Sequence, residues 1–481
     1  MTTPRELLRE HNPFYSSSAG NPWEDRYPDV ESINRQAFEG VLRLVRHKAE
    51  HPRDGCGGLV LGGAGAGKSH LLKRLLLAVR GMDDSAAFTY VRPILAPEAP
   101  MRYLLREIVV NLCKELDAEQ TWTQLDLFAA SILIDFLRNG QDPGKNVKLL
   151  ARLETDPFYI YRARLDAKNL AKAEKRAIRF LKSEIPALET ELLRVIVKYR
   201  RREARTLVVD WLRGEILDEE ESAELGVNSR MDKSAGELEA EASRILLSLG
   251  HLMARYRRPM IVCFDQLDNL HSPEAVRALE AMVHFLVDQT PAMLPLVFAR
   301  GDSWNSRFEK EMDPAAGHRL TGNQFRLEGC SLDQARELVA LRLGTFLGDR
   351  SEEAFDWLWG RLKGKVKEGY SPRQIIILAN REIGSPVPPR TGGGSPLLNA
   401  YQDECKAVLA DLDSWSMDGK RLELALETYL KAHPCVTQLR PGNARFTATV
   451  VVPTPPLLPT TSIICPIFLG LLRLGSVAFF L

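Results

Sequence analysis

The chain has 481 residues, and because single hydrophobic cores stop growing at about 250–300 residues, we expect two or three domains. Hydrophobic residues make up 45% and charged residues 26%, which is typical of a globular protein with a sizeable core. The formal net charge of +1 excludes binding of polyanions through the overall charge, so any nucleic-acid contact needs a local basic patch.

The first part of the chain predicts an irregular lead-in over residues 1–33, with turn signals at two Asn-Pro pairs. A helix is expected from about Asn34 to Ala49, because apolar residues recur there at helical spacing. The short apolar strand Gly58–Leu61 follows, then a glycine-rich turn, then a helix over Ser69–Val79. Strand, loop and helix in this order are the context that a phosphate-binding loop requires.

Short apolar runs downstream predict the remaining buried parallel strands. They are Ala87–Leu95, Met260–Phe264, Leu294–Ala299 and Gln324–Leu327. The stretch from about 118 to 256 is mostly helical and longer than an ordinary crossover, so we interpret it as a helical insertion. Three helices are expected after the last strand, at Ser331–Phe346, Glu352–Leu362 and Ser371–Glu382.

The glycine-rich turn fits the pattern GxxxxGK[ST]. Glycines let the backbone approach phosphates closely, and backbone N–H groups with the start of the following helix attract the anion. The sequence therefore predicts ATP as ligand, with Lys68 on the β- and γ-phosphates and the Ser69 hydroxyl on Mg²⁺. The predicted nucleotide-binding residues are Gly62, Gly63, Ala64, Gly65, Ala66, Gly67, Lys68, Ser69 and His70.

A second motif is the apolar strand Ile261–Phe264 ending in the carboxylate of Asp265. This is the Walker B arrangement, and it predicts that Asp265 is a ligand of the metal; the alternative is an ordinary aspartate at a strand end. Asp268, three residues on, either orients the attacking water as a base or caps the next helix.

With these two motifs the chain resembles the additional-strand P-loop ATPases, that is, the AAA+ proteins and the related STAND proteins. Within them it is most similar to the origin-recognition-like branch and to bacterial ATPases of mobile-element and phage-defence loci. The resemblance covers roughly residues 30–385. It implies an α/β fold, a three-layer P-loop core with a parallel sheet, a large helical insertion and a C-terminal helical lid.

The resemblance also implies roles for three arginines. Arg300, at the end of the fourth core strand, matches the sensor 1 position, with Asp302 and Ser303 as rivals. Arg319, just before the fifth strand, stands where these families place an arginine finger that acts on a neighbour's nucleotide. Arg373 opens the third lid helix, like the sensor 2 arginine that senses the γ-phosphate. For each arginine the alternative is a solvated surface charge.

One position departs from the family pattern. Many AAA+ proteins have Asp-Glu at the end of the Walker B strand, where the Glu polarises water, but here Gln266 follows Asp265. Glutamine cannot accept a proton, so either Asp268 serves as base or hydrolysis is slow. This favours a nucleotide-driven switch over a fast motor.

The resemblance and the residue pattern together divide the chain. The expected parts are a lead-in over 1–33, a P-loop core over 34–330 with the insertion at about 118–256, a lid over 331–383, a Gly/Pro/Ser linker over 384–396, a helical segment over 397–445 and an apolar tail over 446–481. The tail holds five prolines and one charge, and its segment Ser462–Leu481 is long enough to span a bilayer. A misread or disordered end, a membrane anchor and a buried helix are all compatible with it.

The insertion is divided by charge. Ile160–Arg205 holds 14 Lys/Arg and 6 Asp/Glu, a balance of +8, and Asp210–Glu241 holds 3 and 11, a balance of −8. These are either solvated helix faces that pair with each other or a basic surface for DNA or an acidic partner. The run Lys198–Arg202 favours the second, because Tyr199 between basic residues is able to stack on a base. Trp211–Glu215 and Leu225–Val227 also resemble a segment of some defence-associated ATPases.

These observations predict an ATP-dependent switch, an ATPase of low turnover, that acts in DNA transactions or phage defence. The alternatives are a nucleotide-binding scaffold without turnover and a DNA-binding protein. Expected partners are further copies of the chain or effector proteins of the same locus, and a membrane partner is not expected. Seven scattered cysteines without CxxC spacing, and an N-terminus without an apolar segment, predict a cytoplasmic location.

Overall fold

The computed structural model describes most of the chain up to residue 384 and one hairpin beyond it. The described residues are 3–16, 22–23, 28–81, 86–92, 96–117, 120–140, 147–162, 167–267, 270, 272–308, 312, 314–384, 439–442 and 445–448. They form a compact unit over Met1–Ser385, and the hairpin belongs to a second unit over Pro386–Leu481.

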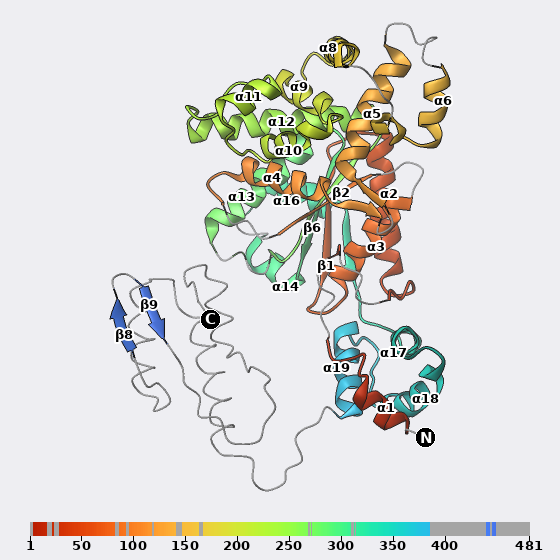
Figure 1. Cartoon of the computed structure of the whole chain (residues 1–481). Helices are drawn as coiled ribbons and strands as arrows, with labels where there is room; N and C mark the ends of the chain where they lie inside the picture. The colour runs from red at the N-terminus through yellow and green to blue at the C-terminus, as the bar shows by residue number, and fades with distance from the viewer. Residues whose placement is uncertain are drawn as a thin grey trace. The chain divides into compact units, whose positions relative to one another are not determined.

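A five-stranded parallel sheet forms the centre of the first unit (Figure 1). Its strands are β1 (Gly58–Gly62), β2 (Ala87–Val91), β5 (Met260–Phe264), β6 (Met293–Ala299) and β7 (Gln324–Leu327), in the order β2-β5-β6-β1-β7. The predicted strands are confirmed in position, except that the second ends at Val91 and residues 93–95 lie outside the described residues. The expectation of burial was wrong for β7, because it is an edge strand in which Gln324 and Arg326 are exposed and only Leu327 is buried. Since all five strands run the same way, their carboxyl ends meet at one edge, and β6 separates β1 from β5.

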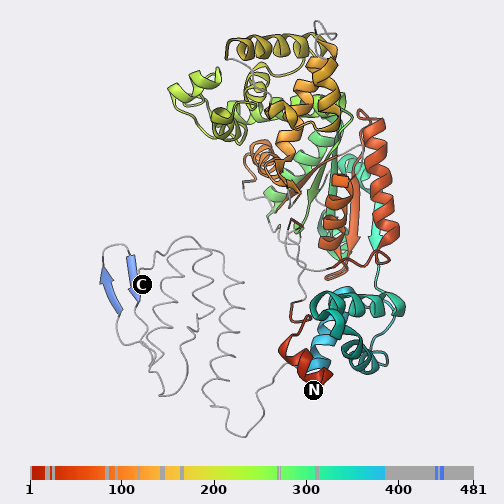
Figure 2. The ribbon, with the colours of Figure 1, turned by 45° about the vertical axis from the view of Figure 1, so that its right-hand side comes forward.

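Helices cover both faces of the sheet, because successive strand residues point to opposite sides. One layer is α2 (Arg35–Glu50) and α3 (Lys68–Gly81), which pack on Val60, Phe88 and Phe298. The other layer includes α4 (Pro100–Leu112), α12 (Ala235–Arg255) and α13 (Pro273–His284), which pack on Leu59, Phe264 and Val297. The three-layer α/β core predicted from the sequence is therefore present (Figure 2).

The insertion after α4 is helical, as predicted, apart from a small hairpin of β3 (Glu115–Asp117) and β4 (Gln120–Thr123). Its helices before α12 are α5 (Gln124–Asn139), α6 (Val147–Thr155), α7 (Tyr159–Arg162), α8 (Ala167–Glu184), α9 (Thr190–Lys198), α10 (Arg205–Leu212) and α11 (Glu219–Leu225). A 3₁₀ turn, Arg202–Ala204, joins α9 to α10. Figures 1 and 2 show these helices gathered at one end of the sheet.

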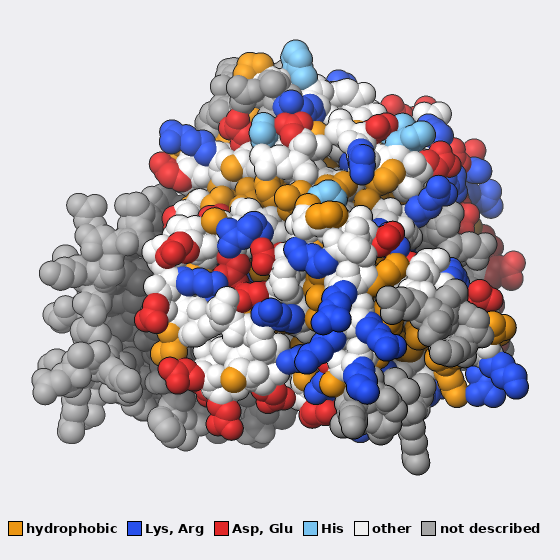
Figure 3. All heavy atoms as spheres, turned by 90° about the horizontal axis from the view of Figure 1, so that it is seen from above, with side chains coloured by type: hydrophobic (Ala, Val, Ile, Leu, Met, Phe, Trp, Pro, Cys, Tyr) orange, Lys and Arg blue, Asp and Glu red, His pale blue; other side chains and the backbone are white. Residues whose placement is uncertain are grey.

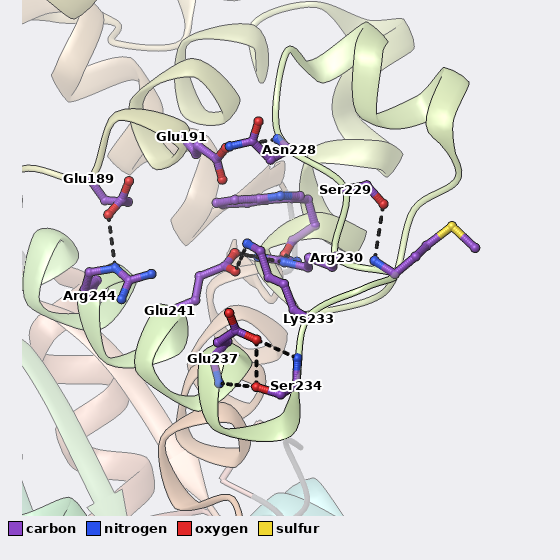
Figure 4. Close-up of polar contacts among 12 residues, drawn as sticks. Glu189, Glu191, Asn228, Ser229, Arg230, Lys233, Ser234, Glu237, Glu241 and Arg244 are labelled. Atoms are coloured by element: carbon purple, nitrogen blue, oxygen red, sulfur yellow. Dashed lines mark hydrogen bonds and ion pairs between the residues drawn. The ribbon is translucent and has the colours of Figure 1, made fainter.

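The segment containing Trp211 forms a buried ionic network (Figure 4). Arg230 and Glu241 are ion-paired at 2.7 Å, and their side chains are only 4% and 6% exposed. The Arg230 guanidinium lies 4.3 Å from the centroid of the Trp211 ring and donates to the Trp211 carbonyl oxygen. Lys233 binds the second oxygen of Glu241. The Trp211 segment therefore packs within the insertion, where its ring and carbonyl oxygen contact Arg230.

A helical lid follows β7, and the N-terminal segment packs against it. Its helices are α17 (Leu332–Leu347), α18 (Ser351–Leu362) and α19 (Pro372–Ile383). The lead-in predicted to be irregular contains helix α1 (Pro4–Glu10), and Leu8, Phe14 and Val30 are buried in the core of the lid. The prediction of an irregular lead-in was wrong here, because the hydrophobic partners of these residues lie more than 300 positions away. Figure 1 shows α1 beside α18 and α19.

Short helices and helical turns lie before and after β6. Before β6 come α13 and the π-helical turn Phe285–Gln289, and between β6 and β7 lie α14 (Gly301–Ser303), the π-helical turn Trp304–Phe308 and α16 (Pro314–Thr321). The second unit shows the antiparallel hairpin β8 (Leu439–Gly442) and β9 (Arg445–Ala448), which crosses the boundary expected at 445. The linker over 384–396 beyond Gly384, residues 397–438 of the helical segment expected over 397–445, and the apolar tail from 449 lie outside the described residues. The helical expectation was wrong for Leu439–Gly442, which form strand β8 instead. No helix among the described residues is long and apolar enough to cross a membrane.

Candidate functional site

The glycine-rich loop joins β1 to α3 at the carboxyl edge of the sheet. Gly65 and Gly67 have φ angles of +78° and +104°, which side chains with a Cβ rarely adopt. Lys68 is the first residue of α3, and its Nζ donates to the carbonyl oxygens of Gly62 at 2.6 Å and Gly63 at 3.2 Å. The loop therefore wraps around its own lysine, and the ammonium lies inside the cradle where a phosphate is expected.

Asn34, which the sequence marked only as a helix start, holds this loop in place. It lies just before α2 with φ of +56°, and its side chain does not cap that helix. Instead its Nδ2 donates to the Ala66 carbonyl at 2.8 Å, and its Oδ1 accepts from the Glu328 amide at 3.1 Å. The sequence shows only that an Asn precedes a helix. It cannot show the role of Asn34 in holding the loop, because the hydrogen-bond partners are 32 and 294 positions away.

The residues before Asn34 run along α3 and join it to the lid. Arg74 of α3 pairs with Asp29 at 2.9 Å and donates to the Ile33 carbonyl. From the lid, the Gln334 side chain donates to the Ser32 carbonyl at 2.7 Å. This N-terminal strap, residues 28–34, thus contacts the loop, its helix and the lid.

Asp265 follows β5 at the same edge of the sheet, and its side chain is buried. The Tyr90 hydroxyl, from the neighbouring strand β2, lies 3.3 Å from Asp265 Oδ2 and donates to it. The Gln266 side-chain amide in turn donates to the Tyr90 oxygen at 3.2 Å. Burial, and then the adjacent Asp265 carboxylate, raise the pKa of Tyr90 well above its usual range, so the hydroxyl keeps its proton.

Gln266 itself has a left-handed backbone, with φ of +60°. This conformation is uncommon for a residue with a side chain and often occurs at functional sites. The sequence marks Gln266 as a departure from the pattern that the resemblance implies, but it gives no sign of Tyr90, because nothing in the local sequence indicates which strand lies next to β2. Asp268, the predicted base, lies outside the described residues.

The oxygens of this edge suit a magnesium nucleotide. No group of three or more His, Cys, Asp or Glu that would hold a metal is present among the described residues. Mg²⁺ does not require such a group, because it commonly binds one or two protein oxygens, phosphates and waters. Ser69 in the first turn of α3 and Asp265 after β5 are the residues of this edge that would supply them.

Arg373 of the lid lies against the glycine-rich loop. Its backbone N–H donates to the Gly65 carbonyl with an N···O distance of 3.4 Å. A Cβ on Gly65 would come within 2.3 Å of the Arg373 Cβ, so only glycine permits this approach. Arg373 stands in the first turn of α19, which Ser371 caps, and its side chain is exposed. The structure thus places the backbone of Arg373 against the glycine-rich loop, and the predicted contact of its side chain with a γ-phosphate stays a prediction.

Arg300 directly follows β6, the strand between β1 and β5, and is therefore at the same edge. Its guanidinium lies 3.6 Å from the carboxylate of Asp302. Its Nε is buried and has no hydrogen-bond partner among the described residues. A buried donor of this kind is suited to an acceptor that a ligand would bring. The rival residue Asp302 is 93% exposed.

Arg319 is not at this edge. It lies in the last turn of α16. The following residue, Leu320, packs beside Gly57, which precedes β1. Arg319 pairs with Asp288 at 2.8 Å, just before β6 begins, and His284 binds the other Asp288 oxygen at 3.0 Å. The arginine is thus on the opposite edge from the chain's own glycine-rich loop. A role on a neighbouring copy's nucleotide would require the pair with Asp288 to open.

His70 lies in the first turn of α3 and is half-buried. Burial, and then the positive charges of Arg342, Lys73 and Arg74, lower the pKa of His70 below its ordinary value. The imidazole is therefore held neutral beside a group of cations. Arg342 itself is buried in the lid and donates to the Pro13 carbonyl at 2.8 Å.

The basic run Lys198–Arg202 does not form the stacking surface expected from the sequence. Tyr199 is buried, so it is not available to a base, and that prediction was wrong. Arg201 forms a two-bond pair with Glu174, with distances of 2.8 and 2.6 Å, and Arg200 donates to the Ile160 carbonyl. Arg202 is exposed. The spacing of charges predicted an exposed basic surface here, but Tyr199 is buried and Arg200 and Arg201 are bonded to other parts of the insertion.

No protein-family model, curated protein or solved structure matches the chain. The site must therefore be interpreted from its own residues. It combines a glycine-rich loop between β1 and α3, a lysine whose ammonium is bound by that loop, a buried carboxylate two strands away and a lid helix that begins beside the loop.

Proposed function

We propose that this chain is an ATP-binding molecular switch of the AAA+/STAND kind, with slow hydrolysis. The observation that carries the proposal is the loop Gly62–Ser69, which leads from a buried strand into α3 and is covered by the first turn of α19. A triphosphate in that loop would meet backbone N–H groups, Lys68 and the positive end of two helices. Asp265 and Ser69 supply oxygens for the accompanying Mg²⁺.

The strand order supports the same proposal. In additional-strand ATPases one strand separates the P-loop strand from the Walker B strand, and here β6 stands between β1 and β5. Arg300 directly follows that strand, which is the sensor 1 position of the resemblance. Arg373 begins α19 against the loop, which fits a lid that responds to the γ-phosphate.

The test is calorimetric titration of Mg·ATP into the full chain and into the Lys68→Ala variant. Loss of a charge-assisted phosphate contact, worth about 1.5–3 kcal/mol, should weaken binding about 10- to 100-fold. Lys114→Ala is the matched control, because Lys114 is exposed and its hydrogen bonds are made by its backbone. Equal ATP affinity in a folded Lys68→Ala variant would contradict the proposal.

A nucleotide-binding scaffold without turnover is the second candidate, and Gln266 favours it. This residue replaces a carboxylate and is bonded to Tyr90. Phosphate release decides between the two. A switch that hydrolyses ATP should lose turnover in Asp268→Asn and keep most of it in Gln266→Ala, because only the aspartate accepts a proton. If the unchanged chain releases no phosphate above the Lys68→Ala background, the scaffold is the better description.

A further inference from the structure

Helix α8, Ala167–Glu184, has two faces of different chemistry. The inner face, Glu174, Ala177 and Leu181, is buried in the insertion. The outer stripe consists of exposed Lys172, Lys175, Arg176 and Arg179. Both sets follow the spacing i, i+3, i+4 or i+7, which places each along one side of a helix. At 1.5 Å per residue, the outer stripe spans about 10 Å.

The outer stripe differs from the other basic residues of the insertion in its contacts. Arg201 is paired with Glu174, and the Lys182 ammonium donates to the Leu188 carbonyl at 2.6 Å. None of the four outer cations makes a hydrogen bond or an ion pair to any part of the chain that the structure describes. The acidic segment over 210–241 does not neutralise them. The expected pairing between the two charged segments is therefore not seen for this stripe.

The surroundings of the outer stripe show what kind of partner it suits. Among the described side chains of residues 148–162 and 171–215, no large hydrophobic side chain is exposed, and the nearest exposed ones along the chain are Val147 at 62% and Ile216 at 58%. A membrane surface helix and a protein–protein hot spot both need such side chains, and single-stranded nucleic acid needs an exposed ring for stacking. Charge without apolar surface is the signature of contact with a phosphate backbone.

We propose that the outer stripe of α8 binds the phosphate backbone of double-stranded DNA without reading its sequence. Figure 3 views the molecule from the side on which α8 lies in Figure 1, and that face shows a cluster of Lys and Arg side chains together with further charges of both signs. This proposal assigns the DNA contact to α8 instead of the run Arg200–Arg202, whose side chains are largely engaged within the chain. It does not depend on nucleotide binding by the glycine-rich loop.

The experiment measures binding of a fluorescent mixed-sequence duplex to the full chain, without nucleotide, at several salt concentrations. The test variant carries Lys172→Glu, Lys175→Glu, Arg176→Glu and Arg179→Glu. Four lost phosphate contacts should lower the slope of log K against log salt by about 3.6. The wild type should therefore lose about 100-fold more affinity than the variant between 50 and 200 mM salt. If the reversal impairs folding, the four corresponding Gln substitutions replace it.

The matched control reverses four exposed cations elsewhere, Arg43, Arg46, Lys363 and Lys367, so that net charge changes by the same amount. It should leave the slope unchanged and weaken binding less than about threefold at 200 mM salt, where long-range charge effects are screened. The proposal is overturned if the wild type does not bind duplex at 50 mM salt, if both variants lose the same affinity, or if single-stranded DNA binds more tightly than duplex. It is also overturned if the stripe variant changes only the sedimentation of the free protein, since the stripe then contacts a second copy.

Discussion

The side-chain amide of Asn34 donates to the carbonyl of Ala66 at 2.8 Å, so the residue that ends the N-terminal strap holds the glycine-rich loop. The same side chain accepts from Glu328 after β7. One residue thus links the loop to the end of a strand beside it. The order of the loop depends on a contact outside the motif that defines it.

Replacing Asn34 with Gly should weaken nucleotide binding. Glycine tolerates the left-handed backbone at this position, so the change removes the two side-chain hydrogen bonds without adding strain. Each bond contributes about 0.5–1.5 kcal/mol, so we expect about 1–3 kcal/mol less stability in urea unfolding and lower ATP affinity by calorimetry. Asn34→Ala should cost more, because alanine disfavours a positive φ. Equal ATP affinity in Asn34→Gly and wild type would contradict a role in holding the loop.

Tyr90→Phe should reduce turnover more than ATP affinity. The hydroxyl donates to Asp265 and accepts from Gln266, so its loss frees both side chains beside the expected metal. A reduction of about tenfold or more in steady-state phosphate release is expected, which corresponds to about 1.4 kcal/mol in the barrier. Tyr103→Phe is the control, since that hydroxyl donates to the Arg92 carbonyl instead. Similar turnover in the two variants would show that the Tyr90 hydroxyl does not position Asp265.

Nucleotide should control the contact between the core and the lid. The Arg373 amide already lies on Gly65, but only a γ-phosphate gives its side chain a ligand shared with Lys68. Such a contact, present in one state only, would shift a two-state equilibrium about 10- to 100-fold. Hydrogen exchange over 331–382 should therefore be slower with a non-hydrolysable ATP analogue than with ADP. Arg373→Ala keeps the backbone bond and should abolish the difference; equal exchange in both nucleotides of the wild type would refute it.

Glu241→Ala should destabilise the insertion strongly. Glu241 neutralises Arg230 in a buried pair, and removing one partner leaves a buried charge uncompensated. We expect a loss of about 3–5 kcal/mol in the free energy of unfolding, measured in urea. Asp232→Ala, an exposed acid on the same connection, should change stability by no more than about 0.5 kcal/mol. A loss below about 1 kcal/mol in Glu241→Ala would mean that the pair contributes little.

His70 should make the protein less stable at acidic pH. Its pKa is lowered in the folded state, so above pH 6.5, its ordinary pKa, both the folded and unfolded chains hold a neutral imidazole. As the pH falls below that value, the unfolded chain binds a proton that the folded chain does not, and stability is lost until the pH reaches the folded pKa. His70→Gln should therefore lose less stability than wild type between pH 7.5 and 5.5 in urea unfolding. The exposed His318→Gln should behave like wild type; an identical loss in all three would exclude the effect.

The sequence by itself determined the local features of this protein. Buried parallel strands are short continuous apolar runs, so β1, β5 and β6 were predicted closely from the order of apolar residues alone. The edge strand β7, Gln-Phe-Arg-Leu, was placed correctly but is mostly exposed. The glycine-rich loop was equally clear, since the positive φ angles of Gly65 and Gly67 are what that spacing of glycines permits. The beginning of α19 at Ser371-Pro372 is a local capping signal, and it placed Arg373 correctly at a helix start.

Only the tertiary structure decided which of these features meet. Asn34 and Ala66, Tyr90 and Asp265, and Phe14 and the lid are joined by contacts between distant segments, and no local periodicity encodes them. The charge pattern of the insertion had the same limit: it predicted a basic segment, but burial of Tyr199 and the Arg201–Glu174 pair decided which cations face solvent. The physical reason is that side-chain burial depends on how the helices pack, and that packing is a property of the whole chain.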